Sequence, residues 1–312
     1  MWQYAARRIL LLAPTLLAVY TIVFVLFHAT PGGPWDGEKP VSDRVKEQLD
    51  AKYGLDKPLW QQYSDYLVRV VTRLDLGPSY HYTSRTVNDI IRAFFPNSLR
   101  LGLLAMALAI AVGIPAGAVA ALEQNTWIDR TLMALALLGA TLPSFIVGPL
   151  LVWGVVLALP DLGIDLGLPT GGWGEPRHLV LPAATLAIGP AAIVARYTRA
   201  ALVEVIHMEY ILTARAKGLH ERVVVLRHAL KNALIPVTTV VGVLFAVVIT
   251  GSFYVEFIFS VPGIGQSFVA GVTNRDYPVL MGVTLLFATV MALVNLAVDL
   301  VYGLLDPRIR YQ

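Results

Sequence analysis

The chain alternates long apolar runs with shorter polar connections. A helix needs roughly 20 consecutive apolar residues to cross the hydrocarbon core of a bilayer. Six segments reach or approach that length, which predicts an all-α membrane protein with six transmembrane helices. We place the spans at residues 9–29, 99–122, 131–159, 179–201, 236–255 and 279–305.

Composition and charge distribution agree with this prediction. Of the 312 residues, 56% are hydrophobic and 14% are charged, against about 25% charged in soluble proteins. If the helices simply alternate, most basic residues outside the long first loop lie on one side, so the net charge of +3 does not indicate nucleic-acid binding. The positive-inside rule then predicts that both termini are cytoplasmic.

This topology divides the chain into three parts. Residues 1–29 form the cytoplasmic N-terminus and first span, 30–96 form an extracytoplasmic loop, and 97–312 form a core with five further spans. Apolar residues at helical spacing in the loop predict two amphipathic helices. These helices either rest on the membrane surface or form a platform for an external protein.

A basic segment rich in small residues lies within the loop 203–235, between spans four and five. A membrane protein has no structural need for a helix there, so we expect a soluble partner to dock on it; the alternative is a basic loop that only obeys the positive-inside rule. Small side chains would let it enter a cleft, and a glycine commonly ends such a helix. The candidate docking residues are Glu209, Tyr210, Ala214, Arg215, Ala216, Lys217 and Gly218.

This segment closely resembles the EAA loop of binding-protein-dependent ABC permeases, in the form found in oligopeptide and dipeptide permeases. The general motif has a proline where this chain has Lys231, and Pro236 follows later, as in the peptide branch. The order and spacing of other motifs extend the resemblance along the whole chain. They are Pro31-Gly32-Gly33-Pro34, Tyr53-Gly54-Leu55-Asp56-Lys57-Pro58, Asp75-Leu76-Gly77, Pro262-Gly263-Ile264-Gly265-Gln266, Asn274-Arg275-Asp276-Tyr277 and the ending 305–311.

The resemblance implies the permease subunit of an ABC importer for peptides in a bacterial or archaeal cell membrane. It implies four kinds of partner besides the peptide and membrane lipid: a second homologous permease subunit, two cytoplasmic ATPase subunits and an extracytoplasmic substrate-binding protein. ATP and Mg would bind to the ATPase subunits, and this chain would hold no cofactor. The same branch includes permeases for nickel, glutathione and other small solutes, which remain alternatives.

Other functional classes find little support. The chain has no Gly-x-x-x-x-Gly-Lys-Ser/Thr phosphate-binding loop, which an ATPase of its own would need. It also lacks the His-Glu-x-x-His of a metalloprotease, and its six histidines show no metal-ligand spacing. An ion-coupled carrier would be expected to show more charged residues at the bilayer midplane.

Apart from Arg100 in the first turn of span two, spans two, three and five carry no charged side chain. A path for many different peptides should avoid fixed charges, and a narrow apolar constriction can close by dewetting. The gate candidates are Phe145, Val152, Phe245 and Ile249. Glu256, at the outer end of span five, is either part of an outer gate or an interfacial residue.

Overall fold

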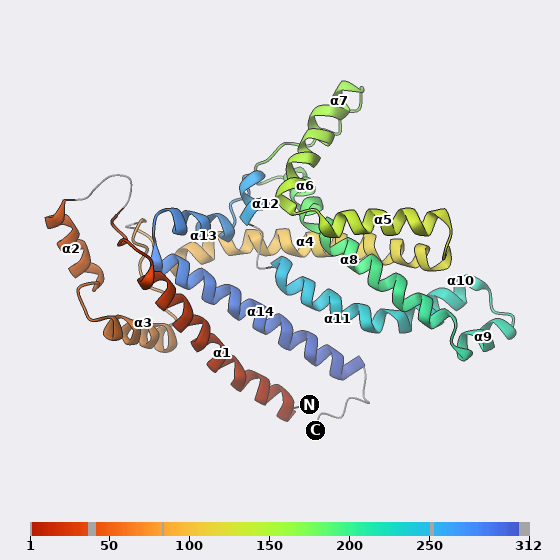
Figure 1. The fold of residues 1–312 in the computed structure, drawn as a ribbon, viewed down its shortest axis with the longest axis horizontal. Coiled ribbons are helices and arrows are strands. Elements are labelled where there is room, and N and C mark those ends of the chain that lie inside the picture. Colours follow the sequence, from red (N-terminus) through yellow and green to blue (C-terminus); the bar gives the residue numbers. More distant parts are fainter. Residues whose placement is uncertain (1, 37–41, 83, 250–252, 306–312) are drawn as a thin grey trace.

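The computed structural model describes residues 2–36, 42–82, 84–249 and 253–305, and side chains within these ranges from residue 10 to residue 298. The described part is helical, with only one isolated β-bridge (Figure 1). Its longer helices are α1 (Trp2–Ala29), α4 (Val87–Leu122), α8 (Val180–Ile206), α11 (Leu230–Ile249) and α14 (Tyr277–Leu305). The shorter ones are α2 (Asp43–Tyr53), α3 (Leu59–Arg73), α5 (Trp127–Thr141), α6 (Ser144–Leu151), α7 (Leu159–Asp161), α9 (Glu209–Ala216), α10 (Glu221–Val223), α12 (Phe253–Ile258) and α13 (Ile264–Thr273).

The predicted all-α architecture with six spans is confirmed. Six helical stretches of the described chain are long and apolar enough to cross a membrane. They are Leu10–Ala29, Val87–Leu122, Ser144–Asp161, Pro176–Ile206, Glu221–Ile249 and Tyr277–Val298.

The third span differs from its prediction as one helix over 131–159. Leu142 has extended backbone angles because a following proline disfavours the α conformation. The chain therefore bends at Pro143, between α5 and α6. α5 has 15 residues, about 22 Å, which is too short to span a bilayer alone. After α6 the helix continues through the π-helical turn η1 (Val152–Ala158) into α7.

The fifth span also differs from its predicted bounds of 236–255. The helix begins at Glu221, passes through the π-helical turn η3 (Val224–Ala229) and ends at Ile249. Pro236 therefore lies inside the helix and not at its start. Residues 250–252 lie outside the described chain, and α12 follows them as a separate short helix.

The centre of the fold is the contact between α4 and α8, which Figure 1 shows side by side with α5 and α11 packed against them. Glycines allow the two helices to approach backbone to backbone. A Cβ at Gly113 would lie 2.7 Å from the Ala191 carbonyl oxygen, and one at Gly117 would lie 2.3 Å from that of Ala195. Small residues of this kind drive helix packing in lipid, where no hydrophobic effect operates between helices.

The two amphipathic helices predicted in the 30–96 loop are present as α2 and α3. α3 lies across the ends of α1 and α14, and its apolar face packs on them through a cluster that includes Tyr20, Phe24, Tyr66 and Met281. α2 buries no side chain of its own. It is held by Trp35, whose indole donates a hydrogen bond to Asp50 over 2.7 Å.

Several of the family-like motifs meet where α14 begins. Arg275 donates hydrogen bonds to the carbonyl oxygens of Pro31 and Gly33 over 3.1 and 3.4 Å. The Tyr277 hydroxyl donates to the Gly32 carbonyl over 3.2 Å. Gly32 has a φ of +89°, and a Cβ there would collide with the Arg275 guanidinium. The ending 306–311 lies outside the described residues.

Asp276 fastens the 30–96 loop to the same point. Its side chain is 1% exposed and accepts hydrogen bonds from the Ser79 hydroxyl and from the backbone N–H groups of Tyr80 and His81. It also accepts a bond from the N–H of Val279 in the first turn of α14. One buried carboxylate therefore joins two segments that are almost 200 residues apart.

Replacing Asp276 by Ala should destabilise the protein, because it leaves several buried donors without a partner. We expect a loss of about 2–4 kcal/mol, measured as a fall of several degrees in the Tm of the detergent-purified chain. Asp43→Ala, at an exposed carboxylate in the first turn of α2, should leave the Tm unchanged. Equal Tm values for the two variants would contradict the assigned role of Asp276.

Candidate functional site

The segment between α8 and α11 forms a short, well-terminated helix. α8 ends at Ile206, Met208 adopts an extended conformation as the N-cap, and α9 follows over Glu209–Ala216. The N–H of Gly218 bonds to the Arg215 carbonyl over 2.9 Å, and the N–H of Leu219 bonds to the Ala214 carbonyl over 3.4 Å. This pair of bonds is a Schellman motif. Gly218 has a φ of +77°, so the predicted termination by glycine is confirmed.

One side of α9 is packed against the membrane helices. Ile211 is 0% exposed and Ala214 is 8% exposed. Both belong to a buried cluster with the last turns of α4 and α8 and the start of the fifth span; its other members are Ala121, Leu202, Val205, Val224, Ala229 and Ala233. The methyl group of Ala214 therefore faces the interior of this chain and not its exposed surface.

The opposite side of α9 is exposed and partly apolar. We call this the outer surface of α9: Met208, Glu209, Tyr210, Leu212, Ala216, Lys217, Gly218 and Leu219. Five of the predicted docking residues lie on it. The sequence-based prediction of the docking residues did not include Met208, Leu212 and Leu219, whose exposed fractions are 41%, 54% and 40%. A helical-wheel plot with Ile211 turned inward would have identified Leu212.

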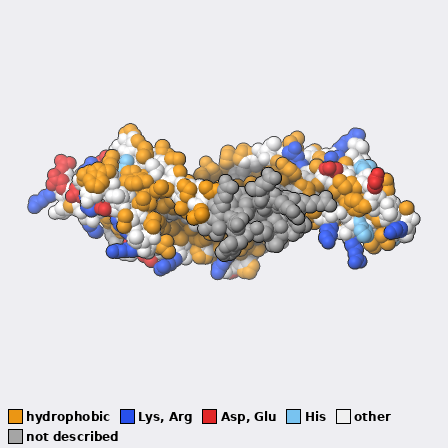
Figure 2. All heavy atoms as spheres, turned by 90° about the horizontal axis from the view of Figure 1, so that it is seen from below, with side chains coloured by type: hydrophobic (Ala, Val, Ile, Leu, Met, Phe, Trp, Pro, Cys, Tyr) orange, Lys and Arg blue, Asp and Glu red, His pale blue; other side chains and the backbone are white. Residues whose placement is uncertain are grey.

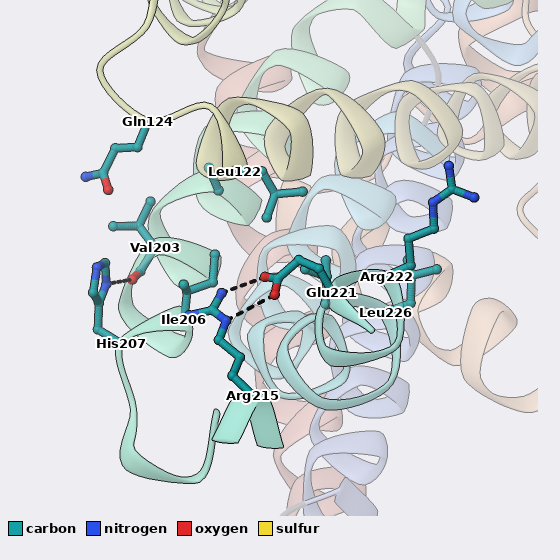
Figure 3. A pocket seen from close by; sticks show the side chains of 11 residues that line it. Leu122, Gln124, Val203, Ile206, His207, Arg215, Glu221, Arg222 and Leu226 are labelled. Carbon is teal, nitrogen blue, oxygen red and sulfur yellow. Dashed lines mark hydrogen bonds and ion pairs between the residues drawn. The ribbon is translucent and has the colours of Figure 1, made fainter. Parts of the chain in front are cut away.

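Arg215 is not a free cation. Its guanidinium donates two hydrogen bonds to the Glu221 carboxylate, with Nε–Oε2 and Nη2–Oε1 distances of 3.2 and 2.6 Å (Figure 3). This ion pair joins the end of α9 to the start of α10, so Arg215 fixes the shape of the loop.

A cleft of about 660 Å³ lies beside this ion pair. Figure 3 shows its walls: the end of α4 at Leu122, the end of α8 at Val203 and Ile206, and the first turns of the fifth span at Arg222 and Leu226. Positively charged side chains and histidines gather at this end of the molecule, whereas the described surface towards the middle is mainly hydrophobic (Figure 2). The end of the molecule that carries α9 thus offers an apolar recess with a basic rim.

A second ion pair, between α5 and α8, was not predicted from the sequence. Arg199 on α8 donates from Nε and Nη2 to the two carboxylate oxygens of Asp129 on α5, over 2.6 and 2.7 Å. The Asp129 side chain is 4% exposed, and the N–H of Asn125 adds a third bond over 2.9 Å. The pattern Thr126-x-x-Asp129, which is typical of a helix N-terminus, was the feature of the sequence that could have drawn attention to Asp129.

The four apolar gate candidates do not meet at one point within the described residues. The Phe145 ring is exposed and lies 5.5 Å from the Tyr254 ring. Val152 is half-buried against a cluster to which α4, α8 and α12 contribute, and Phe245 is half-buried between α4 and α8. Ile249 is buried, and a Cβ at Gly102 on α4 would lie only 3.0 Å from its Cα.

Glu256 is 0% exposed and is therefore not an interfacial residue. Its carboxylate accepts hydrogen bonds from the Ser98 hydroxyl on α4 over 2.6 Å and from the Gly265 N–H over 2.8 Å. Its backbone carbonyl accepts a bond from the Gln266 side chain. A Cβ at Gly263 would lie 2.3 Å from its carboxyl carbon, so only glycine fits there. Burial raises the pKa of Glu256, against the effect of these hydrogen bonds.

Comparison with known proteins gives family matches over most of the chain. Residues 113–311 match the family described as binding-protein-dependent transport system inner membrane component. Residues 1–101 match the family of N-terminal segments of such membrane components.

Individual relatives are similar over their whole length. The dipeptide transport system permease protein DppB of Bacillus subtilis is 43% identical over 99% of this chain and 98% of that protein. The oligopeptide transport system permease protein OppB of Salmonella typhimurium is 42% identical, with both chains fully covered. A solved structure of the MetNI methionine ABC transporter, in inward-facing conformations, matches with a TM-score of 0.57 and 20% identity. That match covers 70% of this chain and 96% of the other, and it supports the fold alone.

The Asp129–Arg199 pair predicts a specific pH dependence of stability. Arg199 holds the pKa of Asp129 below its ordinary value of 3.8. The contribution of Asp129 is therefore fully present above that value and is lost as the pH falls through the lowered pKa of the folded state. Asp129→Asn should cost about 2–3 kcal/mol at neutral pH, seen as a lower Tm, and the difference from wild type should shrink below about pH 4.

The matched control is Asp161→Asn, at an exposed carboxylate at the end of α7. Its Tm should equal that of the wild type at every pH. A difference between wild type and Asp129→Asn that grew as the pH fell would contradict the stabilising role of the ion pair.

Proposed function

The chain belongs to the family of binding-protein-dependent transport system inner membrane components, and from that premise we propose that it is the first permease subunit of an ATP-driven ABC importer for peptides. In this proposal it forms the translocation pathway together with a second, homologous permease subunit. Two cytoplasmic ATPase subunits bind ATP and Mg and hydrolyse the nucleotide. The chain itself holds no cofactor and carries out no catalysis.

The observation that carries the proposal is the two-sided packing of α9. Its inner side is buried against three membrane helices, while its outer surface is exposed and presents small and apolar side chains between polar ones. A helix that only connected two spans would gain nothing from exposing Leu212, which is 54% exposed. Tyr210 is 40% exposed, although its hydroxyl accepts a hydrogen bond from Asn232 on α11 over 2.7 Å. We assign this outer surface, with Glu209, Tyr210, Ala216, Lys217 and Gly218, to docking on an ATPase subunit, and Ala214 and Arg215 to holding α9 in place.

Docking alone would not drive transport. The ATPase must bind α9 differently in its open and closed states, because only a differential affinity can shift a conformational equilibrium. Movement of α9 would be passed to α4, α8 and the fifth span, which share the buried cluster behind it.

The substrate class rests on the relatives. Those named dipeptide and oligopeptide permeases are 42–43% identical over essentially the whole chain, including the 30–96 loop. In the proposal the outer end of the molecule, with α2 and α3, receives an extracytoplasmic substrate-binding protein. The peptide passes between apolar walls, and Phe145, Phe245 and Val152 remain candidates for the seal because none of the three is fully buried. Ile249 would support the seal from behind, and Glu256 would anchor the outer loop beside it.

The docking assignment is tested by paired substitutions. Ala216→Trp should leave the Tm of the isolated chain unchanged but weaken docking about tenfold, because overfilling a packed contact costs about 1–3 kcal/mol. Peptide uptake by the assembled transporter should fall accordingly. Ala214→Trp should instead lower the Tm of the isolated chain, because it overfills the cluster behind α9.

Two controls bracket this experiment. Ala216→Ser keeps the side chain small and should transport like wild type. Ala93→Trp places the same bulk at an exposed position near the opposite end of the molecule and should not affect docking. Wild-type uptake by the Ala216→Trp protein would refute the assignment.

The proposed topology puts α9 and both termini in the cytoplasm and α2 outside. The chain has no cysteine, so single introduced cysteines report their own positions. A membrane-impermeant maleimide should label Glu47→Cys on α2 in intact cells, whereas Lys217→Cys should react only after permeabilisation. Labelling of Lys217→Cys in intact cells would show that the proposed topology is inverted.

A further inference from the structure

A cavity of about 310 Å³ lies at the outer end of the molecule. Its walls are the end of α2, the turn that joins α2 to α3, α3 itself, the segment 77–80 and the start of α14. Its volume is at the lower end of the range for small-molecule sites. Three of the side chains that line it are cationic and none is a carboxylate. The residues that matter here are Lys52, Tyr53, Lys57, Tyr66, Arg69 and Tyr80.

Arg69 is the most informative of the cations. Lys57 is paired with Asp65 over 2.8 Å, and the ammonium group of Lys52 lies 5.1 Å from the Tyr53 ring. Arg69 is half-buried and makes neither a hydrogen bond nor an ion pair with any residue that the structure describes. A planar guanidinium with free donors in a concave site is suited to bind an oxyanion.

Tyr66 adds an independent observation. Its side chain is 8% exposed, and its hydroxyl has no hydrogen-bond partner within the described chain. An unpaired buried hydroxyl costs about 1–3 kcal/mol, so it needs an explanation. Tyr66 also lines a second cavity of about 80 Å³, which it shares with Arg69 and which continues towards α1. Burial raises the pKa of both Tyr66 and Tyr80, so both hydroxyls stay protonated and can donate.

The position of the cavity narrows the range of possible ligands. It lies where α1 ends and α14 begins, which is the depth of lipid headgroups for helices that cross a bilayer. Trp60, on the helix that forms one wall, is 72% exposed, and so are Val68 and Val71 further along α3, to 59% and 70%. Tryptophan is enriched at the headgroup level of membranes.

We propose that this cavity is a phosphate-binding site, in which Arg69 and Tyr66 hold the phosphate oxygens and Lys52 supplies further positive charge. The phosphate can belong to a phospholipid headgroup or be free in solution. Nothing in the transport cycle proposed above requires this site, so its success or failure is independent of that proposal.

The test uses the purified full-length chain in detergent. Inorganic phosphate is added in one arm, with chloride at equal ionic strength as its control, and phosphatidylglycerol in the other, with diacylglycerol of the same acyl chains. Binding to the folded state stabilises it by RT ln(1 + L/Kd), where L is the concentration of the ligand, so the Tm rises with that concentration. A rise with phosphatidylglycerol alone identifies a lipid site, and a rise with both identifies a site for free phosphate as well. No rise in either arm would overturn the proposal.

Variants separate this site from general charge attraction. Arg69→Gln should weaken binding at least about tenfold, the effect of losing one charge-assisted contact. Arg73→Gln, one turn further along α3, exposed and not lining the cavity, should bind like wild type. Tyr66→Phe should keep or slightly raise the Tm without ligand, because it removes an unpaired hydroxyl, and should weaken binding several-fold. If both Arg69→Gln and Tyr66→Phe bound like wild type, the assignment would be wrong.

Discussion

The close approach of α4 to its neighbours is the constraint on which the rest of the structure depends. At Gly113 and Gly117 the backbone of α4 touches the backbone of α8, and at Gly102 it touches that of α11. A methyl group at any of these positions would meet carbonyl oxygens or Cα atoms, which cannot move aside as a flexible side chain can. In lipid, such contacts replace the hydrophobic effect as the source of stability. α4, α8 and α11 therefore form a tightly packed unit, and the other elements are attached to its two ends.

The attachments at the two ends use different chemistry. At the inner end in our proposal, α9 is held by small apolar side chains and by the Arg215–Glu221 pair at its edge. At the outer end, buried carboxylates hold the loops in place. Asp276 holds the loop around Ser79, and Glu256 holds the loop at 263–266 against α4. Apolar packing tolerates sliding, whereas a buried carboxylate with several donors fixes one geometry. In our proposal, a displacement of α9 is therefore passed to the membrane helices, while the loops held by Asp276 and Glu256 keep their places.

Much of this arrangement was predictable from the sequence, and the exceptions have physical causes. The lengths of the apolar runs located the six spans, because the thickness of the bilayer sets the length of a spanning helix. Gly218 located the end of α9. The third span was predicted as one helix because hydropathy ignores the effect of Pro143 on Leu142. The fifth was predicted to begin at Pro236, although a proline inside a membrane helix is tolerated where neighbouring groups satisfy the freed carbonyl.

The candidate docking site shows the same limit of prediction from sequence. Composition identified a small-residue helix, but the direction in which each residue points depends on the helices behind it. Ala214 and Ala216 are equivalent in composition, yet one is buried and the other exposed. The partners of Glu256 and Asp129 are more distant still: Ser98 and Arg199 are 158 and 70 residues away. Pairings of this kind depend on the tertiary fold, which local sequence patterns do not specify.

The central claim, that α9 docks on an ATPase subunit through its outer surface, is most directly tested by cross-linking. The cysteine-free chain would carry a single cysteine at Ala216 or, as a control, at the exposed Ala93 on α4. It would bear a short thiol-linked photo-cross-linker and be assembled with its ATPase subunits in detergent. We predict that the label at position 216 forms an adduct with the ATPase and that the label at position 93 does not. Equal adducts from both positions, or none from position 216 in an assembled complex, would contradict the account.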